Sequence, residues 1–183
     1  MPPSHKFIPL ETAVAQLCPA CALCCSGVLF KDVELQPGDC PVTLQSLGLP
    51  VADTKNRRSK MLNRRFPQPC AALEGGRCRI YADRPARCRQ FECALLKAVA
   101  AGKTDTDAAL RSLRVARRRV DQVRTLLREL GDRDGALALS LRFKRTKKRF
   151  EVSRSDDERA ETFSRLTLAV HDLNLFLRGK FYP

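Results

Sequence analysis

The chain has no tryptophan, only two tyrosines and only two histidines among its 183 residues. Such a composition leaves little aromatic surface for stacking nucleobases. With only His5 and His171 as imidazoles, a catalytic zinc site with several histidine ligands is disfavoured. The sequence has no Walker loop, GxGxxG, GxSxG or zinc-protease helix motif, which argues against the enzyme classes that those motifs identify. No apolar run approaches the roughly 18 residues that a membrane span needs.

What the chain does contain is cysteine, nine residues in all, four of them in the segment CPACALCC. Binding of a soft metal is the usual reason for so many cysteines in one short segment. A CxxCxxC run offers three ligands from such a segment. A second group of four follows later in the chain. Cys40 lies between the groups and is expected to be a structural or surface thiol. The predicted metal ligands are Cys18, Cys21, Cys24, Cys25, Cys70, Cys78, Cys88 and Cys93.

Disulfides are one alternative use of these cysteines, and buried thiols that bind nothing are another. The N-terminal residues lack the basic region and the apolar run of a signal peptide, so we expect a cytoplasmic protein with reduced thiols. Neighbouring cysteines such as Cys24 and Cys25 do not easily bond each other, and an odd total weakens a disulfide framework further. The composition therefore favours metal ligation.

The first cysteine group predicts a local helix. Cys18 is expected to be the N-cap and Pro19 the first helical residue, where its missing N–H costs nothing. Cys18, Cys21 and Cys25 would then share one face, while Cys24 would point elsewhere. The N-terminal end of such a helix would also favour thiolate over thiol.

The second cysteine group predicts a hairpin followed by a helix. Residues 74–76 are expected to form a tight turn, and residues 77–81 a short returning strand. A helix capped by Asp83 is expected over residues 85–101. Interleaved arginines would lower the pKa of the neighbouring thiols, unless they only form a solvated basic face. These arginines are Arg77, Arg79, Arg84, Arg87 and Arg89.

The two groups together resemble a known family. CxxCxxCC followed by Cys70 and by GRCRIYADRPARCRQFEC, residues 76–93, is similar to the YkgJ-like cysteine-cluster family, a zinc- or iron-chelating domain. The resemblance spans residues 18–93 and implies a metal site of eight cysteines. The same signature resembles that of flagellin lysine methylases, which are thought to carry an iron–sulfur cluster.

A donor set that is nearly all thiolate suits zinc or iron–sulfur. The closely spaced Cys18, Cys21 and Cys24 resemble a ferredoxin loop, whereas the second group lacks the CxxC pair that would suit zinc. An iron–sulfur cluster or iron is therefore the predicted cofactor, with zinc as the alternative. Such a centre would serve chelation, electron transfer or cluster-dependent modification of a substrate.

We predict a mainly α fold with a short β-hairpin. Residues 1–102 would form a small metal-stapled cysteine lobe, and residues 103–183 a basic amphipathic helical region. Apolar residues spaced alternately by four and three predict helices over residues 104–130 and 155–178, the second opened by a capping box at residues 155–158. The two helices would pack as an antiparallel hairpin and offer a surface to a protein partner. Residues 136–150 alternate like a strand, but their alanine and leucine content favours a helix.

The formal net charge is +14, and residues 142–149 contain six basic residues in eight. Basic runs bind phosphate groups through counterion release, which makes nucleic acid a candidate partner without base specificity. A solubilising face is the simpler interpretation of the same run. The alternative function is thus a structural zinc module on a basic helical domain that binds nucleic acid or a protein.

Overall fold

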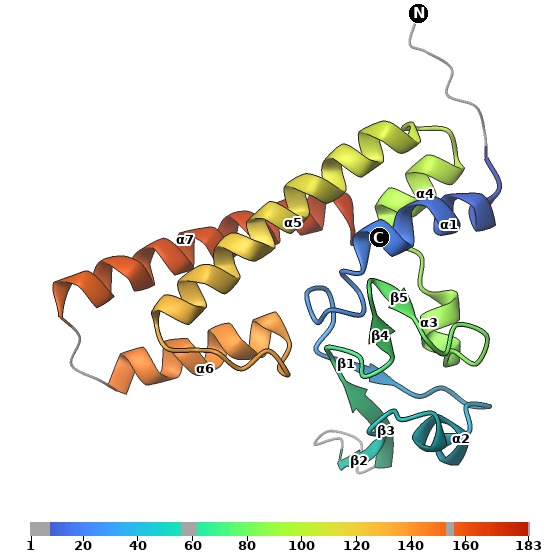
Figure 1. The fold of residues 1–183 in the computed structure, drawn as a ribbon, viewed down its shortest axis with the longest axis horizontal. Helices are drawn as coiled ribbons and strands as arrows, with labels where there is room; N and C mark the ends of the chain where they lie inside the picture. Colours follow the sequence, from blue (N-terminus) through green and yellow to red (C-terminus); the bar gives the residue numbers. More distant parts are fainter. Residues whose placement is uncertain (1–7, 56–61, 153–155, 183) are drawn as a thin grey trace, which may run out of the picture. The chain divides into compact units, whose positions relative to one another are not determined.

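The computed structural model describes residues 8–55, 62–152 and 156–182, and the fold is mainly α with small antiparallel sheets, as predicted (Figure 1). In the described part of the chain, no helix has the length and apolar composition to cross a membrane. The elements in chain order are α1 Leu10–Cys21, β1 Asp32–Glu34, α2 Pro41–Ser46, β2 Ala52–Lys55, β3 Leu62–Pro67, β4 Leu73–Glu74, β5 Arg77–Cys78, α3 Ala86–Gln90, α4 Ala94–Ala100, α5 Thr106–Glu129, α6 Leu139–Val152 and α7 Asp157–Lys180.

The chain folds into two compact units that interleave in sequence. Unit 1 comprises the described residues of Met1–Ala22, Glu92–Arg133 and Phe143–Pro183. Unit 2 comprises those of Leu23–Phe91 and Asp134–Arg142. The proposed functional division between residues 1–102 and 103–183 stays a prediction.

Unit 1 is built on the antiparallel pair α5 and α7 (Figure 1). The side chain of Asp105 accepts a hydrogen bond from the Ala108 N–H and begins α5, which confirms the helix predicted over residues 104–130. Arg119 of α5 donates to the Asp172 carbonyl of α7 at 2.8 Å. The predicted apolar seam of α5 is buried throughout, at Ala109, Leu113, Ala116, Val120, Val123, Leu127 and Leu130.

The second predicted helix is α7, and its cap differs from the expected one. Asp156 caps α7 by accepting the Arg159 N–H at 2.8 Å, while Ser155 lies outside the described residues. Leu166, Leu173 and Leu177 are buried along the predicted seam. Between α5 and α7 the chain forms α6, which confirms the helix predicted for residues 136–150.

Helices α1 and α4 complete unit 1 by packing against each other and against α5. The prediction that Cys18 begins a helix is wrong, because α1 starts at Leu10 and Cys18 lies in its last turns. Ala13 and Leu17 are buried and give this earlier segment the apolar face that stabilises it. Pro19 cannot donate a backbone hydrogen bond, and α1 ends two residues later at Cys21.

The single helix predicted over residues 85–101 is also wrong, because the structure divides it into α3 and α4. The backbone of Phe91 is extended, with ψ at 119°, and this interrupts the helix. Cys93 then caps α4 by accepting the Leu96 N–H at 3.4 Å. Pro85, rather than Asp83, is the N-cap of α3.

Unit 2 contains a three-stranded antiparallel sheet in the order β1-β3-β2, which the sequence analysis did not anticipate. Val33 pairs with Phe66 in the β1–β3 register, and both side chains are buried. The predicted hairpin is confirmed as β4–β5, with Leu73 opposite Cys78, although its return strand is shorter than predicted. Gly75 and Gly76 form its turn with φ of 53° and 83°, a region where glycine is favoured. The hydrophobic core cluster of unit 2 contains Val33, Leu44, Leu49, Val51, Phe66, Ala72 and Ile80.

Candidate metal centre

All nine cysteines lie in the described part of the chain, and none of them forms a disulfide. The eight predicted ligands are divided between the two units. Cys18, Cys21 and Cys93 belong to unit 1. Unit 2 contains the remaining five, Cys24, Cys25, Cys70, Cys78 and Cys88.

The segment after Cys21 leaves the helix and turns back on itself. Ala22 closes α1 in the left-handed conformation, with φ of 52°. Leu23 is buried, and its carbonyl accepts hydrogen bonds from the Val28 and Leu29 N–H groups at 3.3 and 3.1 Å. Cys24 and Cys25 therefore lie in a closed turn, whereas the sequence analysis placed them on a helix.

Gly27 fixes the position of this turn within unit 2. Its φ is 74°, and an added Cβ would lie 3.0 Å from the Ala138 Cα and 3.2 Å from Pro69. Its carbonyl accepts the Leu139 N–H at 2.8 Å. Because both the conformation and the space exclude a side chain, only glycine fits here.

A backbone hydrogen bond joins the two cysteine groups. The Cys70 N–H donates to the Cys25 carbonyl at 2.8 Å, and the Gln68 N–H donates to the Lys31 carbonyl at 3.0 Å. The segment before Cys70 thus runs beside the segment that follows Cys25. This pairing brings a cysteine from each sequence group to one place in unit 2.

Cys70, Cys78 and Cys88 gather against the core of unit 2, and each is partly buried there. Burial is the main cause that raises the pKa of Cys88 to about 11, and its neighbours Cys70 and Cys78 raise it further. Burial likewise raises the pKa of Cys70, to which Cys78 also contributes. The three thiols are therefore close enough to influence one another's ionisation.

The neighbouring arginines act as predicted, but burial outweighs them. Arg84 lowers the pKa of Cys88, and Arg79 lowers that of Cys70, yet both thiols keep a raised pKa. Arg79 donates to Glu74 at 3.0 Å and to the Leu47 carbonyl at 3.0 Å, so part of its charge is engaged elsewhere. The lowering effect predicted for the arginines is present at Cys70 and Cys88, but the larger effect of burial leaves the net pKa of both thiols raised.

Gln68 is a buried side chain beside the cysteines, and the sequence-based predictions did not include it. It is 2% exposed, and its amide hydrogen-bonds the Cys70 thiol, which partly lowers the pKa of that thiol. Among the described residues, its Oε1 atom has no hydrogen-bond partner although it is buried. A buried polar atom without a partner is costly, and it indicates a position where a ligand or its bound water supplies the partner. A glutamine between two prolines carries no sequence signal of this role.

In unit 1, Cys93 lies at the N-terminal end of α4, which packs against α1, the helix that carries Cys18 and Cys21. The start of α4 is fixed by the Ala94 N–H, which donates to the Phe181 carbonyl at 3.1 Å. Burial raises the pKa of Cys93, while the backbone N–H groups at the helix start lower it in part. Cys18 is exposed and Cys21 is half-buried.

The remaining candidate side chains differ from these eight. Cys40 is fully exposed, and a hydrogen bond with Thr43 is the main cause that lowers its pKa. His171 is exposed on α7, and His5 lies outside the described residues. Across residues 8–55, 62–152 and 156–182, no three cysteine, histidine or acidic side chains already stand in position to hold one ion.

The donor chemistry of the two groups suits a soft metal. Partly buried thiols bind zinc and iron as thiolates and release their protons when they do so. In unit 2 these thiols adjoin the buried Gln68, whose amide hydrogen-bonds Cys70, as outer-shell groups do when they orient metal ligands. The residues present therefore fit a thiolate-bound metal.

A family model with the description "CxxCxxCC: Putative zinc- or iron-chelating domain" matches residues 17–110, which include all eight predicted ligands. No curated protein matches the chain, and no solved structure matches it.

Proposed function

Because the chain belongs to the CxxCxxCC family of zinc- or iron-chelating domains, a metal-binding family, we propose that it holds iron as an iron–sulfur cluster and transfers electrons. The observation that carries this proposal is the grouping of thiols in unit 2. Cys70, Cys78 and Cys88 share one core, and the Cys25 carbonyl accepts the Cys70 N–H at 2.8 Å. All-sulfur ligation of this kind is the usual way in which proteins hold iron–sulfur clusters.

We assign the eight cysteines of the two sequence groups as metal ligands, each unit considered by itself. Cys24, Cys25, Cys70, Cys78 and Cys88 would be the ligands from unit 2, and Cys18, Cys21 and Cys93 those from unit 1. The five thiols of unit 2 outnumber the four ligands that a single tetrahedral zinc ion takes, which favours a centre with more than one metal atom. The CxxCxxC spacing favours iron as well.

When bound, an iron–sulfur cluster supplies one-electron chemistry. The chain's own residues would set the surroundings of that centre. Gln68 hydrogen-bonds Cys70, and the core residues Phe66 and Ile80 help to keep water from the sulfurs of unit 2. Because ligating thiols must stay reduced, we also propose a cytoplasmic location.

The second candidate is a structural zinc module on a basic helical domain that binds nucleic acid or a protein. It is favoured by the small hydrophobic core cluster of unit 2, whose described residues lie on short elements and loops that a bound metal would stabilise. The formal charge of +14 suits an acidic partner. In this case the metal would be redox-inert, and function would reside on the helical surface.

Anaerobic purification of the whole chain separates the two candidates. We expect iron and sulfide in the protein and a broad visible absorption that bleaches with dithionite. Cys21→Ser should abolish this absorption, whereas Cys40→Ser, which changes an exposed cysteine outside the eight, should preserve it. Colourless protein with about two zinc ions per chain would overturn the iron proposal and support the zinc module.

A further inference from the structure

Unit 1 contains a cavity of about 430 Å³ that plays no part in the metal centre. Its volume falls within the range of sites that bind small organic molecules, roughly 300–1,000 Å³. The end of α5, the C-terminal half of α6 and the first turn of α7 form its walls. The lining residues are Leu130, Arg145, Thr146, Lys148, Arg149, Phe150, Val152 and Arg159.

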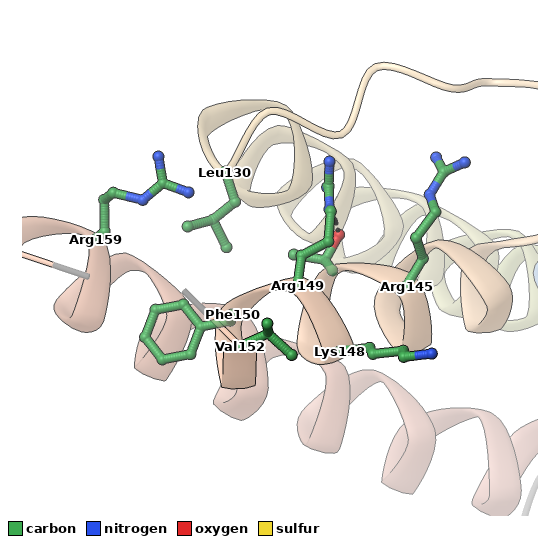
Figure 2. Close-up of a pocket in the computed structure, with 8 residues that line it drawn as sticks. Leu130, Arg145, Lys148, Arg149, Phe150, Val152 and Arg159 are labelled. Carbon is green, nitrogen blue, oxygen red and sulfur yellow. Dashed lines mark hydrogen bonds between the residues drawn. The ribbon is translucent and has the colours of Figure 1, made fainter. Parts of the chain in front are cut away.

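Half of these lining residues carry a positive charge. Figure 2 shows the guanidinium groups of Arg145, Arg149 and Arg159 extending to the same side, with Leu130 between the last two. Guanidinium groups bind phosphate oxygens through paired, charge-assisted hydrogen bonds. The presence of three of them in the lining of one cavity therefore favours an anionic ligand, and a phosphate in particular.

A buried carboxylate holds part of this arrangement in place. The side chain of Asp132 is fully buried and accepts hydrogen bonds from Arg145 at 2.9 and 3.3 Å. Arg149 Nη2 lies 3.9 Å from the same carboxylate and donates to the Thr146 hydroxyl at 3.3 Å. Asp132 thus offsets mainly the charge of Arg145, and Arg149 and Arg159 remain available to an incoming anion.

The other wall of the cavity is apolar. Leu130 is buried, and Phe150 stacks on Phe163 with ring centroids 4.1 Å apart and planes at 9°. Val152 adds an apolar side chain that is 81% exposed. An inorganic ion would leave this wall unused, whereas an organic phosphate would cover it with its non-polar part.

We propose that this cavity binds a small organic phosphate, a molecule of nucleotide size with a phosphate or diphosphate and a planar or apolar group. Arg149 and Arg159 bind the phosphate. Leu130, Phe150 and Val152 contact the rest of the molecule. A small molecule fits this site because its volume of about 430 Å³ lies within the range of small-molecule sites, roughly 300–1,000 Å³.

Calorimetric titration of the metal-loaded chain with adenosine diphosphate tests this site. Inorganic pyrophosphate and adenosine serve as the two halves of the probe, and a short single-stranded RNA represents the macromolecular alternative. We expect adenosine diphosphate to bind more tightly than pyrophosphate, and adenosine to bind least. If none of the probes binds at millimolar concentration, or if only the RNA binds, the proposal is wrong.

A matched pair of double variants locates the binding. The double variant Arg149→Gln with Arg159→Gln should weaken adenosine diphosphate binding by about tenfold or more, because two charge-assisted contacts are lost. The control Arg114→Gln with Arg165→Gln removes the same charge from exposed positions of α5 and α7 outside the cavity, and should change binding less than about twofold. Equal losses in both double variants would show that general charge, and not the cavity, attracts the ligand. Circular dichroism should show unchanged helicity in both, since all four side chains are exposed.

Discussion

The backbone N–H of Cys70 donates a hydrogen bond to the carbonyl of Cys25 across 2.8 Å, although 45 positions separate them in the chain. This contact unites the two cysteine groups within unit 2, and the Cys88 and Cys78 thiols adjoin Cys70. It also places Gln68 beside the thiols, two residues before Cys70.

Metal removal should affect the two units unequally. Unit 2 has only short strands and helices around its core, and a thiolate site contributes roughly 10 kcal/mol or more of apparent binding energy. Helices α5 and α7 pack along a continuous apolar seam instead. After chelation, hydrogen exchange should accelerate across residues 23–91 and change little in the two long helices. Unchanged exchange in residues 23–91 after complete metal loss would contradict this view.

Replacing Gln68 should lower metal affinity strongly while changing the stability of the metal-free protein only slightly. In Gln68→Met the amide that hydrogen-bonds Cys70 is lost, and metal affinity should fall about 10- to 100-fold. The metal-free protein should lose less than about 1 kcal/mol, because the buried Oε1 without a partner is removed as well. Chelator competition and urea unfolding measure the two quantities.

Gln45→Met is the matched control for this experiment. The side chain of Gln45 donates to the Val51 carbonyl at 3.0 Å, so its removal should lower stability by about 1 kcal/mol and leave metal affinity unchanged. If both variants lowered metal affinity equally, Gln68 would have no special role.

Thiol alkylation should follow exposure and pKa. Cys40 is exposed and its pKa is lowered by Thr43, so it should react first with iodoacetamide near neutral pH. Cys88 should react most slowly among the thiols of metal-free unit 2, because burial raises its pKa to about 11. In the metal-loaded protein the eight ligands should be protected while Cys40 still reacts. Mass spectrometry of peptides gives the order, and early loss of Cys88 would contradict it.

The stability of the metal-free protein should decline in alkaline solution. Burial raises the pKa of Cys88 from 9.0 to about 11, so the folded state keeps a proton that the unfolded chain loses. The contribution of the protonated Cys88 thiol to the free energy of unfolding is fully present below pH 9 and is lost as pH rises to about 11. The loss amounts to at most about 3 kcal/mol. Cys88→Ala should flatten the decline relative to Cys40→Ala. Parallel pH profiles from urea unfolding of the two variants would show that Cys88 is not responsible.

The buried carboxylate of unit 1 should matter more than an exposed one. Asp132→Asn leaves Arg145 without its charged partner and should lower the free energy of unfolding by about 1–3 kcal/mol. Asp121→Asn breaks an exposed pair with Arg124 at 3.5 Å and should cost less than about 0.5 kcal/mol. Thermal and urea unfolding compare the two, and equal costs would contradict the role of Asp132.

The sequence by itself determined the features that depend on local pattern. The seam of α5 was predicted residue by residue, because a spacing of three and four places side chains on one helical face regardless of the partner. The Gly75-Gly76 turn was predictable since few residues accept positive φ at both positions. The CxxCxxCC spacing together with the second cysteine group identified the family, because closely spaced thiols are rare outside metal sites.

Only the tertiary structure decided the surroundings of the thiols. The end of α1 and the break at Phe91 depend on which apolar faces pack against other elements. The spacing of residues in the sequence does not indicate this packing. The sheet of β1, β3 and β2 joins strands from distant segments, so no local pattern indicated it. Burial outweighed the expected effect of the arginines on the pKa values of Cys70 and Cys88, since desolvation of a thiolate exceeds the attraction of partly exposed charges. Burial arises from the packing of the whole unit.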